Sequence, residues 1–205
     1  MRLWVTGYRS YELNVFNDKD PKKDVIKAVL KSNLKTRADN GLSWIITGGQ
    51  LGVEQWAVET ALELKKEYAD LKVALMLPFA DFGQNWQENK QQYLLKLKQA
   101  VDFSASVSKQ PYRSPQQLKN YQKFMLGHTD GALLVYDPDY PGKNKFDYQA
   151  IKRQQEKVNM LLNYWTCSTC RMQLQSWLNS KKNEMMMVND QGHLNSLFLK
   201  FLGQN

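Results

Sequence analysis

Short apolar runs alternate along the chain with longer segments in which apolar residues recur every three or four positions. The short runs are typical of buried strands, and the longer spacing is typical of amphipathic helices. The pattern predicts strands at residues 3–6, 44–47, 71–77, 103–107, 131–136 and 158–165. It predicts helices at residues 21–38, 52–68, 86–100, 115–127 and 147–157.

This alternation predicts the fold class. Repeated strand–helix units with buried strands favour a mainly parallel sheet that is covered by helices on both faces. We therefore predict a Rossmann-like three-layer α/β/α sandwich for residues 1–165. Ligands of such sheets bind beyond the carboxyl ends of the strands, near the point where the strand order reverses. That rule selects the loops after Thr6, Thr47, Leu77 and Tyr136.

The C-terminal residues, 166–205, are less regular, and we predict an extension of docked helices there. Several apolar residues fall at helical spacing shortly before Gly203. The polar side of this segment carries one lysine, Lys200, so docking onto the protein's own domain is favoured over a membrane surface or a protein partner. The apolar residues of this segment are Leu194, Leu197, Phe198, Phe201 and Leu202.

Composition places the chain among ordinary soluble proteins, with 42% hydrophobic and 23% charged residues. No apolar run approaches the 18 or so residues that a membrane span needs. The N-terminus reaches Gly7 and Arg9 before the apolar region of a signal peptide could form. We therefore expect a cytoplasmic protein without a membrane span.

The net charge of +8 is uneven, because residues 143–205 carry nine basic and four acidic residues. Such an excess attracts nucleic acid, anionic lipid or phosphorylated ligands. The lysines alternate with Gln and Asn, however, which is typical of a solvated helix face. DNA binding is therefore an alternative and not the leading interpretation.

The most informative segment is the glycine-rich turn of residues 47–54, Thr-Gly-Gly-Gln-Leu-Gly-Val-Glu, between a predicted strand and a predicted helix. The turn holds three glycines, which can adopt positive φ and leave room for a ligand: Gly48, Gly49 and Gly52, with Gln50 between the last two. The N–H groups at the start of the following helix attract anions. The turn is neither a Walker A loop nor a G-x-G-x-x-G fingerprint. Glu54 would repel a phosphate, so it either accepts hydrogen bonds from ribose hydroxyls, holds a metal or water, or serves only as a helix-start carboxylate.

Other candidate ligand-binding residues follow the predicted strands. Arg9 can pair with phosphate through its fork of donors, and Tyr8 beside it can stack on a base. Aromatic and polar residues gather at the same predicted sheet edge, which favours a pocket for a planar base. The candidates outside the glycine turn are Gly7, Tyr8, Arg9, Phe79, Trp86, Tyr136 and Asp137.

The two cysteines, Cys167 and Cys170, form a C-x-x-C pair late in the chain. No thioredoxin-type order of elements follows them, and His128 and His193 complete only a poor zinc set. We expect incidental reduced thiols and no metal. Neither a Ser/His/Asp arrangement nor a spaced carboxylate pair stands out.

Five separated segments occur in an order that resembles a known family. They are residues 5–13, 47–56, 78–86 (Pro-Phe with a later Asn-Trp), 111–115 and 130–138. Together they are similar to the YpsA family of small bacterial proteins. That family lies within the SLOG superfamily, named for the DNA-processing protein DprA and the cytokinin-activating LOG enzymes. The resemblance covers about residues 1–160.

This resemblance implies a nucleotide-binding domain whose glycine turn, with Glu54, contacts a nucleotide, ADP-ribose or an NAD derivative. It also implies a sensor or adaptor that forms homo-oligomers. LOG-type enzymes cleave the bond between base and ribose 5′-phosphate with a P-G-G-x-G-T-x-x-E motif, and residues 137–146 lack its paired glycines and its glutamate. A LOG-like hydrolase, with Glu54 as its acidic residue, and DprA-like DNA binding are the alternatives.

Overall fold

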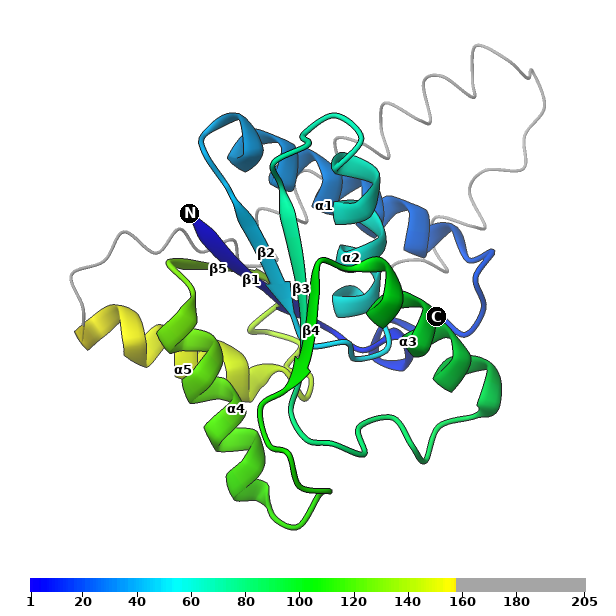
Figure 1. Ribbon diagram of the computed structural model, residues 1–205, viewed down its shortest axis with the longest axis vertical. Coiled ribbons are helices and arrows are strands. Elements are labelled where there is room, and N and C mark those ends of the chain that lie inside the picture. Colours follow the sequence, from blue (N-terminus) through cyan, green and yellow to red (C-terminus); the bar gives the residue numbers. More distant parts are fainter. Residues whose placement is uncertain (158–205) are drawn as a thin grey trace.

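The computed structural model describes residues 1–157, in which parallel strands and helices alternate (Figure 1). The strands are β1 (Arg2–Gly7), β2 (Trp44–Thr47), β3 (Lys72–Leu77), β4 (Phe103–Ser106) and β5 (Gly131–Val135). The helices are α1 (Pro21–Asp39), α2 (Val53–Leu64), α3 (Glu88–Ala100), α4 (Pro115–His128) and α5 (Lys145–Lys157), with a short 3-10 helix, η1 (Ser10–Leu13), after β1.

The strands form one parallel sheet in the order β4-β3-β2-β1-β5. Val5 of β1 pairs with Thr47 of β2 on one side and with Leu133 of β5 on the other. The chain therefore moves outward from β1 to β4 and returns to the far side of β1. This confirms the predicted Rossmann-like sheet and places its switch point between β1 and β5.

The two faces of the sheet are covered by different helices (Figure 1). Successive side chains of a strand point to opposite faces, so Leu3 and Val5 join the apolar core beneath α1, α2 and α3. Trp4 points the other way and joins a second cluster with residues of α4 and α5. The helix residues of this second cluster are Tyr121, Met125 and Ile151.

Most predicted elements are present, and their ends differ by a few residues. The helix predicted from Trp86 begins at Glu88, because the Trp86 N–H donates to the Gly83 carbonyl at 3.0 Å and closes a turn. The helix predicted to reach residue 68 ends at Leu64. The short helix η1 was not predicted. The predicted strand 158–165, the predicted helix near residues 194–202 and the two cysteines lie outside the described residues.

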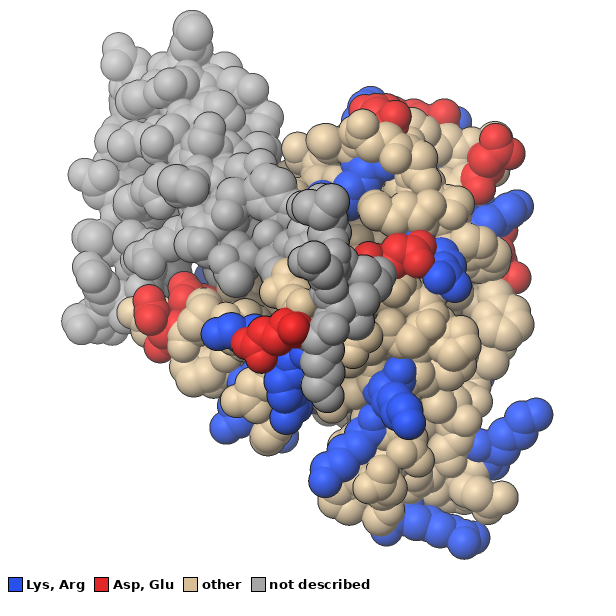
Figure 2. All heavy atoms as spheres, turned by 90° about the vertical axis from the view of Figure 1, so that its left-hand side faces the viewer, with Lys and Arg blue, Asp and Glu red and all other residues tan. Residues whose placement is uncertain are grey.

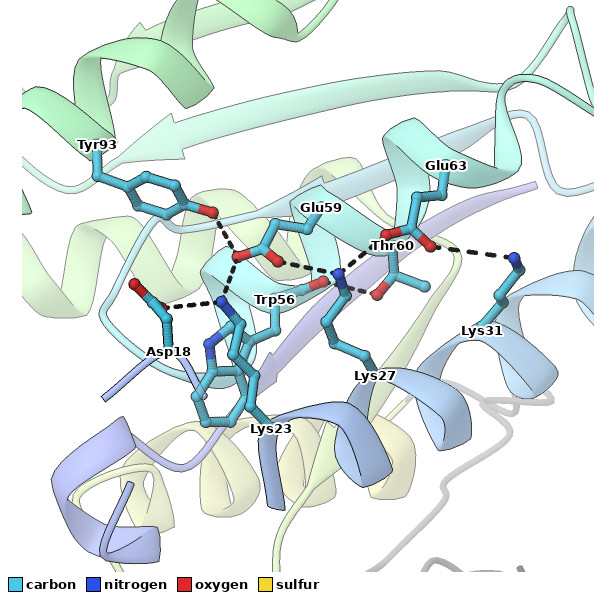
Figure 3. A network of polar contacts seen from close by, with 9 residues as sticks. All are labelled: Asp18, Lys23, Lys27, Lys31, Trp56, Glu59, Thr60, Glu63 and Tyr93. Atoms are coloured by element: carbon cyan, nitrogen blue, oxygen red, sulfur yellow. Dashed lines mark hydrogen bonds and ion pairs between the residues drawn. The ribbon is translucent and has the colours of Figure 1, made fainter. Parts of the chain in front are cut away.

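An ion-pair network fastens α1 to α2 and α3 (Figure 3). Lys27 of α1 lies 3.0 Å from the Glu59 carboxylate and 2.9 Å from that of Glu63, and Lys23 lies 3.4 Å from Glu59. The Tyr93 hydroxyl of α3 donates to Glu59 as well. The Glu59 side chain is only 16% exposed, so a largely buried carboxylate joins the three helices.

No helix within residues 1–157 is both long enough and apolar enough to cross a membrane.

Candidate functional site

The loops that follow β1, β2 and β5 meet at the carboxyl edge of the sheet, beside the switch point. The loop after β1 lies directly on the glycine turn after β2. The Val53 N–H donates to the Tyr8 carbonyl at 3.1 Å, and the Ser10 N–H donates to the Leu51 carbonyl at 3.1 Å. An isolated bridge also joins Arg9 to Gly52. The first turn of α2 is therefore covered by the protein's own backbone.

The glycines of the turn are required by this close approach. Gly52 has φ of 110°, and a Cβ there would lie 2.4 Å from the Ser10 nitrogen. Gly49 has φ of 86°, and its Cβ would lie 2.9 Å from a methyl of Leu77. Positive φ and the missing side chain both favour glycine at these two positions. The turn thus lets the loop after β1 lie directly against the start of α2.

Glu54 is the buried acidic residue at the centre of the site. Only 6% of it is exposed, the Thr6 hydroxyl donates to its Oε1 at 2.8 Å, and the Gln50 N–H donates to its Oε2 at 2.7 Å. Burial raises the pKa of Glu54 from 4.5 to about 7, although both hydrogen bonds act in the opposite direction. Glu54 therefore titrates near neutral pH.

Tyr121 of α4 faces the same space over Gly48. A Cβ on Gly48 would lie 2.3 Å from the Tyr121 hydroxyl and 2.6 Å from Oε2 of Glu54. Tyr121 is 8% exposed, and its hydroxyl has no hydrogen-bond partner among the described residues. Burial raises the pKa of Tyr121 well above 10, so the hydroxyl stays protonated and can donate. A buried hydroxyl without a partner is costly, and a ligand or a water could satisfy it.

A second carboxylate and a cation complete the group. The Gln122 side-chain amide donates to Oδ1 of Asp147 at 2.7 Å, which joins α4 to α5. Removal from water raises the pKa of Asp147 from 3.8 to about 6. The charge of Arg9, which is partly exposed, lowers the pKa of both Asp147 and Glu54. We call Thr6, Arg9, Glu54, Tyr121, Gln122 and Asp147 the switch-point cluster.

The predicted aromatic residues near β1 and β5 are buried and hold the loop after β5. The rings of Tyr8 and Tyr136 lie 5.8 Å apart, and Tyr148 lies 4.9 Å from Tyr136. The Tyr8 hydroxyl donates to the Tyr140 carbonyl at 2.8 Å and accepts from the Asp137 N–H at 2.7 Å. In this conformation the Tyr8 hydroxyl holds the backbone of the loop after β5, and the Tyr136 ring packs against the rings of Tyr8 and Tyr148.

The other two predicted aromatic residues, Phe79 and Trp86, lie in the loop after β3. Each packs on Phe82, with ring centroids 5.5 and 5.3 Å apart. A groove of about 520 Å³ lies beside this loop and is lined by residues 80–84 and by the outer side of α3. None of the twelve residues predicted to bind ligand lines that groove.

The sequence did not single out four members of the switch-point cluster: Thr6, Tyr121, Gln122 and Asp147. Tyr121 has the spacing of an ordinary core residue of α4, and Asp147 resembles any acidic residue in the first turn of a helix. Their places follow from the packing of α4 and α5 on the sheet. Within residues 1–157, no three His, Cys, Asp or Glu side chains form a group that could hold a metal ion.

Fold and site together define a Rossmann-like α/β protein with a partly buried polar cluster at the switch point of its sheet. The family model named YpsA, whose description is "YspA SLOG family", matches residues 3–170 of this chain. The chain therefore belongs to the YpsA family of SLOG proteins.

Relatives that carry the name UPF0398 protein match most of the chain. The UPF0398 protein of Oenococcus oeni is 61% identical over 155 residues, which are 75% of this chain and 82% of that protein. The one from Lactiplantibacillus plantarum is 60% identical over 74% of this chain and 80% of its own length. The one from Limosilactobacillus reuteri is 48% identical over 89% of this chain and 97% of its own length. Membership of the SLOG family indicates a nucleotide-related function, and the name UPF0398 states no ligand or reaction.

Proposed function

We propose that this protein binds a nucleotide or a nucleotide-derived ligand, such as ADP-ribose or an NAD derivative, and acts as a sensor or adaptor. The observation that carries the proposal is the buried Tyr121 hydroxyl, which has no partner among the described residues and faces Glu54 across Gly48. Membership of the SLOG family favours a nucleotide as the ligand.

The proposed roles follow from exposure and charge. Arg9 and Asp147 are partly exposed and would form the mouth of the site, whereas Glu54 and Tyr121 would form its floor. Arg9 would bind a phosphate through charge-assisted hydrogen bonds. Asp147 and Glu54 would accept hydrogen bonds from ribose hydroxyls, and Tyr121 would donate to the ligand.

The glycine turn would give the ligand close access to the backbone. Two of its N–H groups, those of Gln50 and Val53, already donate within the chain. We therefore assign the phosphate chiefly to Arg9 and regard Gly48, with Gly49 and Gly52, as the residues that keep the site open. For the base, Phe79 and Trp86 remain candidates, because Tyr8 and Tyr136 are packed into the core in this conformation.

A thermal-shift panel of nucleoside phosphates, ADP-ribose and NAD tests the proposal. A ligand at about 100 times its Kd should stabilise the protein by about 2.7 kcal/mol. Gly48→Ala should abolish the shift, because the added methyl fills the space between Tyr121 and Glu54. Gly127→Ala is the matched control, since a Cβ there meets nothing within 4 Å. A panel without any shift, or equal shifts in both variants, would refute the proposal.

A second candidate is hydrolysis of the bond between base and ribose, favoured by the raised pKa values of Glu54 and Asp147. A carboxyl group that titrates near neutral pH can exchange protons at its working pH. Water would add to the ribose carbon, and the base would leave with a proton. Incubation with nucleoside monophosphates should then release free base. Activity that survives Glu54→Gln would exclude this mechanism, and a complete lack of released base would exclude the reaction for those substrates.

A further inference from the structure

Basic residues predominate at the start of α4 and in the loop before it, which the Asp81 carboxylate contacts through the Tyr112 N–H. Between residues 103 and 129 the sequence holds four basic residues and no Asp or Glu. All four are exposed, and none takes part in an ion pair found among residues 1–157. We call them the basic α4 face: Lys109, Arg113, Lys119 and Lys123.

Figure 2 shows this side of the molecule, and its lower part, where α4 begins, displays Lys and Arg side chains without Asp or Glu. The lysines of α1 differ, because Lys23, Lys27 and Lys35 are paired with carboxylates of the neighbouring α2 region. Charges that lack such pairing project their field into solvent and attract polyanions.

The spacing of the basic α4 face suits a polymer. Lys119 and Lys123 are one helical turn apart, about 6 Å along the axis, on the side of α4 opposite the buried Tyr121. The preceding loop is fixed by Gln117, whose side-chain oxygen accepts from the Arg113 N–H at 2.6 Å and whose nitrogen donates to the Pro111 carbonyl at 2.9 Å. Lys119 and Lys123 can therefore meet neighbouring phosphates, and the backbone of Arg113 is held against the start of the same helix.

An exposed aromatic residue, Tyr112, precedes Arg113 in this loop. Tyr112 is 46% exposed, its ring centroid lies 5.0 Å from that of Phe79, and its N–H donates to Oδ1 of Asp81 at 2.7 Å. The Tyr112 ring thus packs against Phe79 on one side and is open to solvent on the other. Aromatic rings beside a basic path provide stacking surfaces for unpaired bases.

We propose that the basic α4 face and Tyr112 bind single-stranded nucleic acid, with the cations on phosphates and Tyr112 stacked on a base. A duplex would leave Tyr112 without an unpaired base. An acidic polypeptide would match the charge but offers no base to the ring. The four cations lie outside the switch-point cluster, whereas Tyr112 packs on Phe79, a candidate for the base of the proposed nucleotide. The double lysine variant on α4, which leaves Phe79 unchanged, therefore tests this proposal separately from the proposed nucleotide site.

Fluorescence anisotropy with a labelled single-stranded 20-mer of mixed sequence, as DNA and as RNA, tests this inference on the full chain. At low salt the oligonucleotide should bind. The slope of log affinity against log salt concentration should be no steeper than about −3, from roughly 0.7 for each of four cations. Lys119→Gln combined with Lys123→Gln should weaken binding about tenfold or more at low salt and roughly halve that slope.

Matched variants separate this site from general attraction to a basic protein. Lys90→Gln combined with Lys96→Gln removes the same charge from exposed positions on α3 and should leave affinity unchanged. Tyr112→Ala should weaken binding about fivefold with the salt slope kept, and Tyr112→Phe should bind like the wild type. The inference is overturned by no binding at low salt, by equal losses in the α3 and α4 variants, or by equally effective competition from polyglutamate.

Discussion

Replacing Glu54 by Gln should change how the stability of the folded protein depends on pH. The pKa of Glu54 is about 7 in the folded state and 4.5 ordinarily. Gln has the same shape, and its amide can satisfy both neighbours, by donating to the Thr6 hydroxyl and accepting from the Gln50 N–H. The variant therefore removes the titration while the hydrogen bonds of the site are kept.

The size of the effect follows from linkage. Below pH 4.5, Glu54 is protonated in both the folded and the unfolded chain, so its ionisation costs nothing. Between pH 4.5 and about 7 the unfolded chain releases the proton and the folded chain keeps it, and the free energy of unfolding falls by about 1.4 kcal/mol per pH unit. Above pH 7 the full loss is about 3 kcal/mol.

Urea denaturation of the wild type and of Glu54→Gln at pH 5 and pH 8 measures this loss. The stability of the variant relative to the wild type should be about 2 to 3 kcal/mol more favourable at pH 8 than at pH 5. Glu156→Gln, at an exposed position of α5, is the control and should follow the wild type at both pH values. Parallel behaviour of Glu54→Gln and the wild type would show that Glu54 does not titrate in the folded protein as described.

Three further substitutions test the packing around the site by urea denaturation. Gly52→Ala should lower the free energy of unfolding by about 2 kcal/mol or more, because the new methyl group clashes and the residue has positive φ. Gly41→Ala is also at positive φ but in open space, and it should lower the free energy of unfolding by about 1 kcal/mol. Equal losses in the two variants would contradict the clash. Tyr121→Phe should leave the free energy of unfolding unchanged or raise it by about 1 kcal/mol, since the lost hydroxyl has no hydrogen-bond partner among the described residues. A clear loss of stability would show that the hydroxyl has a hydrogen-bond partner in the folded protein. Glu59→Gln should cost about 1 to 2 kcal/mol, less in 1 M salt, and a loss insensitive to salt would contradict an ion-pair origin.

The sheet could be predicted from the sequence because its strands are short apolar runs between amphipathic helices. Gly131–Val135 is apolar throughout, and burial on both faces of a parallel sheet requires such a run. Helix ends were harder, since Trp86 has the spacing of α3 yet belongs to the turn before it. The helix start is decided by the hydrogen bond that the Trp86 N–H donates to the Gly83 carbonyl. That bond depends on backbone conformation, which the spacing of apolar residues does not encode.

The glycine turn and Glu54 could be found from the sequence, but the closeness of Tyr121 and Asp147 could not. These two residues come from helices far along the chain, and only the return of β5 beside β1 brings α4 and α5 over the turn. The turn itself was predicted as an anion cradle. In the fold, Gly52 also lets the loop after β1 lie against α2, a contact between distant backbone segments that no local pattern reveals.

The central claim is that a nucleotide-derived ligand binds over Gly48, against Tyr121 and Glu54. Native mass spectrometry of the protein purified from its own cells tests this claim most directly, with Gly48→Ala and Gly127→Ala purified alongside. A bound molecule with the mass of a nucleotide or nucleotide derivative is expected on the wild type and on Gly127→Ala, and it should be absent from Gly48→Ala. Retention of the same molecule by Gly48→Ala would contradict the account.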